Sequence, residues 1–354
     1  MDIELVNHTP FLVDTYEYLD REGMEYALVL VRGRYKMEAT LESEHDWNLV
    51  LDEDQGEWFD ADIHYDDDPS ASIRFEKDRV DFKLTTDVIA NAIAHAPEGR
   101  PVKTWQAGVK VGEYQAISQV YGPRQWVRDT IEAPWKLTEP EAVTKVPLRY
   151  ELAYGGEFES YDMEYNELSL CLNPCGCGLI DSNSTARRVP AHQIENTEDV
   201  FNKPNERHYP QGLGFINRYW EPRKQLTGVS LEQIVDDSIP PLQAENLLGN
   251  QAANVQLIMP HYLVGDEVLT LINLLPGKSE QTVSLPREIV YFHSLNLRDE
   301  FDRGYMALDT LVMDLIDRPR FYISWRAVIP TASAIKAVKI AKTKQVLARG
   351  VEHA

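Results

Sequence analysis

Residues 105–120, which read WQAGVKVGEYQAISQV, carry the strongest fold signal in the chain. Apolar or small side chains alternate with polar ones on both sides of Gly112-Glu113, and a period of two is typical of a half-buried β-strand. Two residues that begin with glycine between two such runs favour a tight hairpin turn. The segment therefore predicts an antiparallel β-hairpin.

Other alternating runs extend this prediction to most of the chain. They lie at 31–37, 80–84, 262–274 (with a second predicted hairpin turn at Gly265-Asp266) and 321–327. Helical patterns are few and short, at 231–236 and 242–248, and prolines and glycines predict long ordered loops over 155–225. We expect a mainly β protein, a large, sandwich-like antiparallel assembly that forms one domain over residues 1–330.

Residues 331–354 differ in charge from the rest. They contain five Lys or Arg residues and one acid, Glu352. Ser333 is a suitable N-cap, Gly350 a suitable end, and weakly apolar residues recur between them at helical spacing. The pattern predicts a basic C-terminal helical tail, which either lies in solvent or docks on a partner.

Composition limits the classes of protein that the chain can belong to. The 354 residues include 57 Asp and Glu against 35 Lys and Arg, a formal charge of −22. A polyanion needs a basic face to bind, so we expect no nucleic acid partner. No apolar run reaches the roughly 20 residues that span a bilayer, and the first residues lack the features of a secretory signal. These observations predict a cytoplasmic protein with no membrane partner.

The acidic residues concentrate over 42–68. This stretch holds twelve acids and no Lys or Arg, and Trp47, Trp58 and Phe59 interrupt it. A solvated loop or sheet edge is one interpretation. A calcium loop is another, although 52–56 lacks the alternating ligands of an EF-hand. The third is a docking surface for a basic partner, in which charge steers the encounter and aromatic rings anchor it. Its candidate partner-binding residues are Trp58, Phe59, Asp66, Asp67 and Asp68.

Three cysteines, Cys171, Cys175 and Cys177, lie close together. An odd, local cluster is not a disulfide framework. Three thiolates would need a fourth ligand to complete a tetrahedral zinc site, and His192 follows at a spacing that matches no zinc signature. The sequence favours reduced cysteines in a turn and leaves a metal role open.

The search for catalytic chemistry gives no site. The chain lacks a phosphate-binding loop, a dinucleotide fingerprint, a zinc-protease motif and a nucleophile elbow. We therefore assign no catalytic, cofactor or metal residue and predict that the protein is not an enzyme. The alternative is a carbohydrate-active β-sandwich enzyme or binding module, since 57 carboxylates offer many pairs for glycoside chemistry.

Several segments in order carry a family resemblance. They are NHTPF at 7–11, SIRFEKD at 72–78, Lys83, TD at 86–87, AHAP at 94–97, GRPV at 99–102, PLRYELAYGG at 147–156, NP at 173–174, PQGLGF at 210–215, WEPR at 220–223, LDTL at 308–311 and WR at 325–326. Together they resemble a bacterial domain of unknown function encoded beside type VI secretion genes, whose members are regarded as effector chaperones or adaptors.

The resemblance implies a function through surface contacts. Such a protein would bind a secreted toxin that carries, or is associated with, a PAAR spike-tip domain and help it reach the valine-glycine-repeat spike. The family contributes no catalytic residues. Cys175 and Cys177 stand where the family has a valine and a basic residue around glycines, so the resemblance does not support a metal role for the cysteines.

Overall fold

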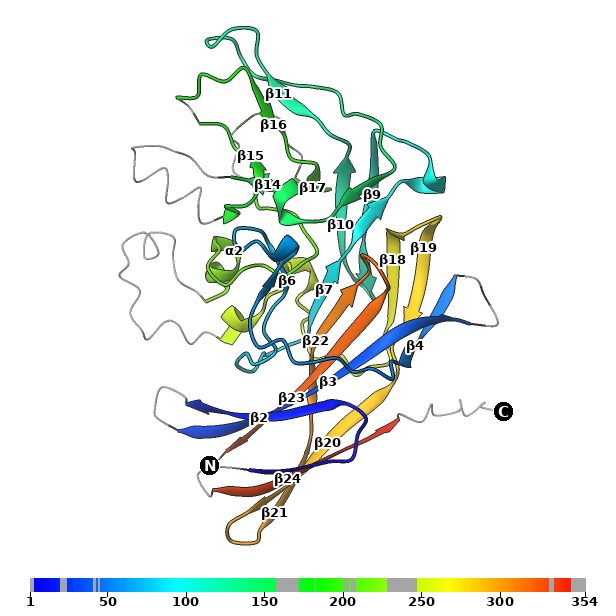
Figure 1. The fold of residues 1–354 in the computed structure, drawn as a ribbon, viewed down its shortest axis with the longest axis vertical. Coiled ribbons are helices and arrows are strands. Elements are labelled where there is room, and N and C mark those ends of the chain that lie inside the picture. The colour runs from blue at the N-terminus through cyan, green and yellow to red at the C-terminus, as the bar shows by residue number, and fades with distance from the viewer. Residues whose placement is uncertain are drawn as a thin grey trace, which may run out of the picture.

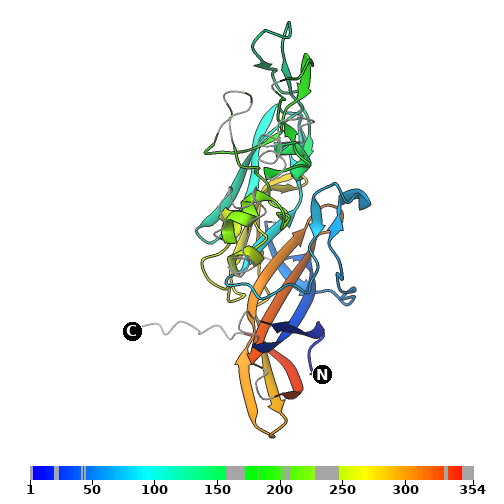
Figure 2. The same cartoon turned by 90° about the vertical axis from the view of Figure 1, so that its left-hand side faces the viewer.

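The computed structural model describes residues 3–19, 24–40, 43, 45–156, 172–181, 183–199, 201, 204, 208–227, 247–330 and 334–344. The protein is mainly β, as predicted, with one short helix among the described elements and several 3₁₀ turns. The molecule is elongated, and its two largest sheets follow one another along the long axis (Figures 1 and 2). No helix among the described residues is long and apolar enough to cross a membrane.

An eleven-stranded sheet forms the body of the molecule. Ten strands follow the order β17-β10-β9-β18-β19-β4-β3-β23-β22-β7, and β2 pairs with β3 beside this path. Their bounds are β2 Leu12–Leu19, β3 Glu25–Ala39, β4 Asp46–Leu51, β7 Asp87–Asn91, β9 Thr104–Val111, β10 Tyr114–Tyr121, β17 Ile194–Asn196, β18 Val268–Leu275, β19 Lys278–Ser284, β22 Ala307–Asp314 and β23 Arg320–Pro330.

A four-stranded sheet lies at the lower end of Figure 1, in the order β1-β24-β20-β21. Its strands are β1 Glu4–Asn7, β20 Glu288–Asn296, β21 Phe301–Tyr305 and β24 Ile335–Lys344. β24 pairs in parallel with β1 and antiparallel with β20, so this small sheet joins the two ends of the described chain.

Short elements complete the upper part of the molecule. A three-stranded sheet consists of β11 Gln125–Val127, β12 Lys136–Leu137 and β16 Arg188–Pro190. Two-stranded pairs join β5 Ile63–His64 to β6 Ile73–Phe75, β8 Ile93–His95 to β13 Lys145–Pro147, and β14 Tyr154–Gly155 to β15 Cys177–Gly178. The helix α2 spans Glu221–Lys224, and much of the described part of 155–225 is loop, as expected.

One continuous apolar core runs through both large sheets. It includes Val29 and Val31 of β3, Ile323 of β23, and Val338 and Ile340 of β24, each fully or almost fully buried. β23 is buried on both faces over residues 323–327, including Ser324 and Arg326, because other elements cover it on both sides. The predicted strands at 31–37, 105–120 and 321–327 are all confirmed, including the hairpin of β9 and β10.

The strand predicted at 80–84 is wrong. Residues 80–84 form an irregular loop, in which Lys83 is buried and Leu84 is exposed, the reverse of what alternation implied. The carbonyl oxygens of Val80 and Phe82 accept hydrogen bonds from the side chains of Tyr16 and Asn250 rather than from a neighbouring strand.

The predicted hairpin at 262–274 is also wrong. β18 is a strand, but it pairs with β9 and β19, and its tight turn follows Leu275. The amides of Val264 and Gly265 donate to the carboxylate of Glu267. These local bonds replace the ladder of a hairpin. The predicted helices at 231–236 and 242–248 fall mostly outside the described residues, and 247–250 is a 3₁₀ turn.

The prediction of a C-terminal helical tail over 331–354 is wrong for the described part of that segment. Its described part, β24, is a strand and belongs to the same folded unit as residues 1–330. Ile335, Val338 and Ile340 are buried between β1 and β20, and Lys342 pairs with Glu288 at 2.6 Å. Burial of three branched side chains outweighs the weak helical pattern of small residues.

Candidate functional site

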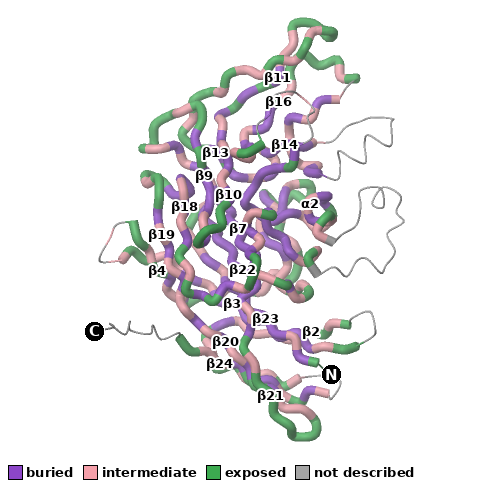
Figure 3. The backbone as a smooth tube through the Cα atoms, turned by 180° about the vertical axis from the view of Figure 1, so that it is seen from behind, coloured by how far each residue is buried: buried purple, intermediate pink, exposed green. Residues whose placement is uncertain are grey.

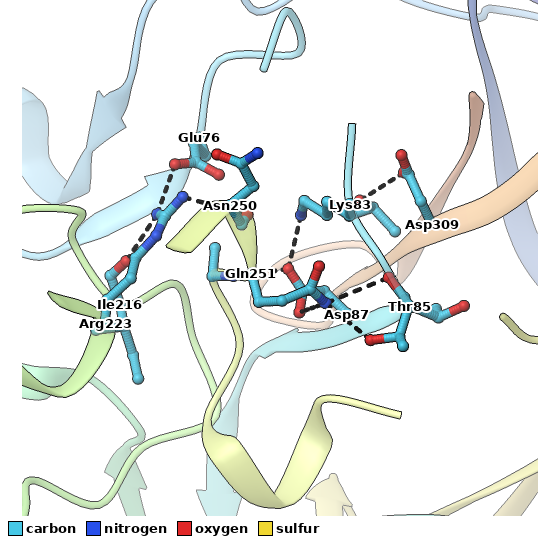
Figure 4. Close-up of polar contacts among 12 residues, drawn as sticks. Glu76, Lys83, Thr85, Asp87, Ile216, Arg223, Asn250, Gln251 and Asp309 are labelled. Atoms are coloured by element: carbon cyan, nitrogen blue, oxygen red, sulfur yellow. Dashed lines mark hydrogen bonds and ion pairs between the residues drawn. The ribbon is translucent and has the colours of Figure 1, made fainter. Parts of the chain in front are cut away.

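Charged residues of the sequence motifs lie buried inside the molecule, on β7, β22, β23 and nearby loops. Figure 4 draws Glu76, Lys83, Asp87, Arg223 and Asp309 among them. The ammonium group of Lys83 lies 2.7 Å from the Asp87 carboxylate, and both side chains are buried. Asp87 also accepts hydrogen bonds from the Gln251 amide at 3.0 Å and the Ala252 backbone amide at 2.7 Å. Its carboxylate therefore has a donor on each oxygen.

A second buried pair joins β22 to β23. The guanidinium of Arg326 contacts the carboxylate of Asp309, and it also donates to the hydroxyl of Tyr16 at 3.0 Å and to the carbonyl of Asp78 at 2.9 Å. Burial alone would lower the pKa of Arg326, but the adjacent Asp309 outweighs it and raises that pKa. Arg326 therefore stays protonated inside the protein.

A third pair attaches α2 to the SIRFEKD segment. The Glu76 carboxylate lies 2.7 Å from the guanidinium of Arg223 and 3.2 Å from that of Arg218. Burial would raise the pKa of Glu76, but Arg223 and Lys83 outweigh it, and the pKa lies below its usual value. Glu76 thus stays ionised at neutral pH.

These pairs surround a cavity of only about 30 Å³. Its walls include Arg32, Glu76, Asp78, Lys83 and Arg326. A cavity of this volume holds about two water molecules. Buried charges are tolerated when each has a partner, and here every one of these groups has one. The motif residues therefore form an internal polar framework that fixes loops to the sheet.

The predicted partner-binding aromatics lie against this framework. Trp58 and Phe59 are half-buried, and the Arg32 guanidinium lies 5.3 Å and 4.5 Å from their ring centroids. Phe59 also stacks on Phe75, with centroids 4.6 Å apart, and packs against the main core. Phe59 has a clear packing role in the protein's own fold.

The predicted acidic residues form an exposed turn. Asp66 and Asp67 adopt left-handed backbone angles, with φ of 58° and 56°. Asp66 lies 2.6 Å from Arg149, whose hydrogen bond lowers the Asp66 pKa, and Asp68 accepts from the amide of Ser70. Asp66 and Asp68 line an open groove of about 430 Å³. The structure thus brings the three acids together, apart from Trp58 and Phe59.

Cys175 and Cys177 are described, whereas Cys171 lies outside the described residues. Burial raises the pKa of the Cys177 thiol to about 11 and that of Cys175 further. Both thiols are therefore protonated at neutral pH, and the thiolate is the form that binds metals or attacks substrates. Among the described residues, no group of three or more His, Cys, Asp or Glu is placed to hold a metal ion.

An exposed face of the small sheet is a site that the sequence analysis did not single out. We call it the β21 surface. Its members are Tyr291, His293, Leu295, Phe301, Arg303, Tyr305 and Lys339. Phe301 and Tyr305 are each 79% exposed, and the strand with its adjoining turn is largely exposed in Figure 3. A groove of about 410 Å³ runs along it, lined by Tyr291, His293, Arg303 and Tyr305 among others. Large exposed apolar groups that gather on one face mark interaction sites.

A sequence signal for this surface exists. Phe301, Arg303 and Tyr305 alternate with Asp302 and Gly304, the pattern of a short strand. The pattern does not reveal which face is covered, because that depends on strands β20 and β24, which are distant from each other in the chain.

Comparison with known proteins places the chain in a family. The model of a family described as "Uncharacterized protein conserved in bacteria (DUF2169)" matches residues 22–326. The chain belongs to this family. The match covers the framework residues and all of β21, and it ends at Arg326. Searches of the curated proteins and of the solved structures gave no significant match.

Proposed function

We propose that this member of the family is a non-enzymatic cytoplasmic adaptor. It binds a type VI secretion toxin that carries or accompanies a PAAR domain, and it assists loading of that toxin onto the valine-glycine-repeat spike. The secretion context derives from the sequence resemblance described above. The observation that carries the adaptor role is the β21 surface, where Phe301 and Tyr305 stand 79% exposed on a sheet edge.

The placement of charge also supports the adaptor role. Glu76, Asp78, Asp87 and Asp309 each contact an Arg or Lys side chain within the protein. These carboxylates stabilise the fold through internal contacts, so the charged groups available to a partner are those on the surface. An adaptor acts through surface area and complementary charge, which such a surface supplies.

Co-expression with a toxin that carries or accompanies a PAAR domain tests the proposal. We expect the toxin to co-purify with the protein and to lose solubility and secretion when the protein is absent. A toxin that is equally soluble and equally secreted without it would contradict the adaptor role. The carbohydrate-active alternative would instead require turnover or binding of a glycan, which the same purified protein can be assayed for.

A further inference from the structure

The backbone of β21 has one paired edge and one open edge. The Met306 amide donates to the Val290 carbonyl, and the Asn296 amide donates to the Glu300 carbonyl. In an antiparallel pair, hydrogen-bonded positions recur at every second residue. Asp302 and Gly304 therefore face β20, and the backbone groups of Phe301, Arg303 and Tyr305 point away from it.

The open edge is free of strands among the described residues, since β21 pairs with β20 alone. The Arg303 amide donates to the carboxylate of its neighbour Asp302, which confirms that it points away from β20. An added strand would take over the Arg303 amide from Asp302, and the other outward-facing backbone groups of β21 form an open row of donors and acceptors, the template that strand addition needs.

The side chains on this edge have a definite order. Phe301, Arg303 and Tyr305 lie on one face, opposite Leu295, His293 and Tyr291 of β20. The central pair continues across the sheet, because His293 lies opposite Lys339 of β24. The face thus presents a basic row, Lys339-His293-Arg303, between two apolar or aromatic rows.

The basic row has no acidic partner within the described part of the chain. Lys339 and Arg303 lie on either side of His293 in a protein whose formal charge is −22, and neither cation contacts a carboxylate among the described residues. Most other cations described above are paired with carboxylates. An unpaired row of this kind is complementary to an acidic ligand.

We propose that β21 binds, by strand addition, an extended segment of the partner protein in which an acidic residue is flanked by apolar residues two positions away on either side. The acidic side chain would lie beside Arg303, and the apolar ones beside Phe301 and Tyr305. The pattern is symmetric, so it suits either strand direction. This inference deepens the proposed adaptor function and rests on it for the identity of the partner.

A second copy of the chain is a poor occupant of this edge. Antiparallel pairing of two β21 strands about their centres would place Arg303 opposite Arg303 and Phe301 opposite Tyr305. The direct Arg–Arg contact opposes such a dimer. An acidic side chain opposite Arg303 would instead attract it, so the charge pattern favours a different protein as the occupant of this edge.

Binding of synthetic peptides to the purified protein tests the inference. The probe is a fluorescent peptide with the core Ile-Thr-Glu-Thr-Val, and the comparison peptides carry Lys in place of Glu or N-methylated amides at the strand-pairing positions. We expect the Glu peptide to bind and both comparison peptides to bind at least about tenfold more weakly, since the first loses the charge contact and the second the backbone hydrogen bonds.

Two variants localise the binding. Arg303→Glu should weaken the Glu peptide by about tenfold or more and improve the Lys peptide. Arg298→Glu, in the exposed turn before β21, makes the same change in net charge and should leave affinity within about twofold. Both positions are exposed, so equal thermal unfolding midpoints are expected and serve as the folding control.

Other outcomes would overturn the inference. Equal binding of the Glu and Lys peptides, or binding that Arg303→Glu leaves unchanged, would remove the β21 site. So would Arg303-dependent binding to phosphatidylserine vesicles without peptide binding, or an Arg303-dependent dimer in sedimentation. Failure of the adaptor role can be told apart from failure of the β21 site. If only the adaptor role fails, the Glu peptide still binds but no toxin co-purifies. Conversely, if the toxin co-purifies equally well with the Arg303→Glu variant, the adaptor role stands but the β21 surface is not the toxin-binding site.

Discussion

Asp309 is the extra residue of a β-bulge in β22, and its carboxylate contacts the guanidinium of Arg326 on β23. Leu308 and Thr310 pair with Trp325 and Ser324, so the register shifts by one residue at Asp309. A bulge redirects a side chain relative to the regular alternation of a strand. The irregularity therefore positions a carboxylate beside an arginine that the sheet has removed from water.

Asp309→Asn should lower the free energy of unfolding by about 3–5 kcal/mol, because it leaves the buried Arg326 without a countercharge. Urea unfolding monitored by tryptophan fluorescence measures this loss. The matched control is Asp317→Asn, whose carboxylate is 81% exposed and 3.9 Å from Arg74, and its effect should stay within about 0.5 kcal/mol. Similar losses in both variants would contradict a special role for the pair.

Phe59→Ala should lower the stability by about 2 kcal/mol, since Phe59 stacks on Phe75 and covers Arg32 but is only half-buried. The same variant should retain toxin binding if packing is its main role. Trp58→Ala is the informative companion, because Trp58 was predicted to bind a partner and lies on the same arginine. If the Trp58→Ala variant has the stability of the unmodified protein but no longer binds the toxin, Trp58 has the predicted docking role.

The acidic turn offers a separate binding test. Asp67 is exposed, and among the described residues its carboxylate makes no ion pair. Charge reversal of Asp66, Asp67 and Asp68 together should slow association with a basic partner by about tenfold at low salt, and the difference should shrink as salt is added. Asp67→Lys alone avoids breaking the contact between Asp66 and Arg149. An association rate that none of these changes alters would remove the turn as a docking surface.

Stability should decrease between pH 7 and pH 5.5 through His192. Burial lowers its pKa from the ordinary value of 6.5, although the hydrogen bond with Glu195 opposes this. Below pH 6.5 the unfolded chain gains a proton that the folded protein resists. The stabilisation is therefore complete above that pH and is lost below it, by up to about 1.4 kcal/mol per pH unit. Burial shifts His95 in the same direction.

His192→Gln should reduce this dependence, as measured by urea unfolding at about pH 7.5 and about pH 5.5. His261→Gln, at an exposed position, is the control and should leave the dependence intact. Glu195, whose pKa is lowered from 4.5, contributes only at lower pH and does not complicate this window. An unchanged pH dependence in His192→Gln would show that folding does not shift the pKa of His192.

The sequence predicted the parts of the fold that depend on local pattern. The hairpin of β9 and β10 needs only alternation and a glycine turn, and both are visible within residues 105–120. The same reasoning is wrong for the loop 80–84. Strand alternation would place Lys83 in solvent, but Lys83 is buried because it pairs with the carboxylate of Asp87, four residues later. A charged residue that a fold buries looks, in sequence, like one that faces water.

The β21 surface and the polar framework depend on contacts between distant segments. Glu76 meets Arg223, 147 residues later, and Arg74 meets Asp314, 240 residues later. No local spacing encodes such pairs. The sequence shows the basic residues of 331–354, but the position of Lys336, Lys339, Lys342 and Lys344 on β24, beside β20, does not follow from helical spacing of small residues.

The placement of β24 has a consequence for synthesis on the ribosome. The strand is translated after the other strands described here, yet it lies between β1, translated first, and β20. Until residues 335–344 emerge, β1 lacks its neighbour and Lys339 is absent from the basic row. A nascent or prematurely terminated chain would therefore carry an incomplete β21 surface, and partner capture would be reserved for chains translated at least through β24.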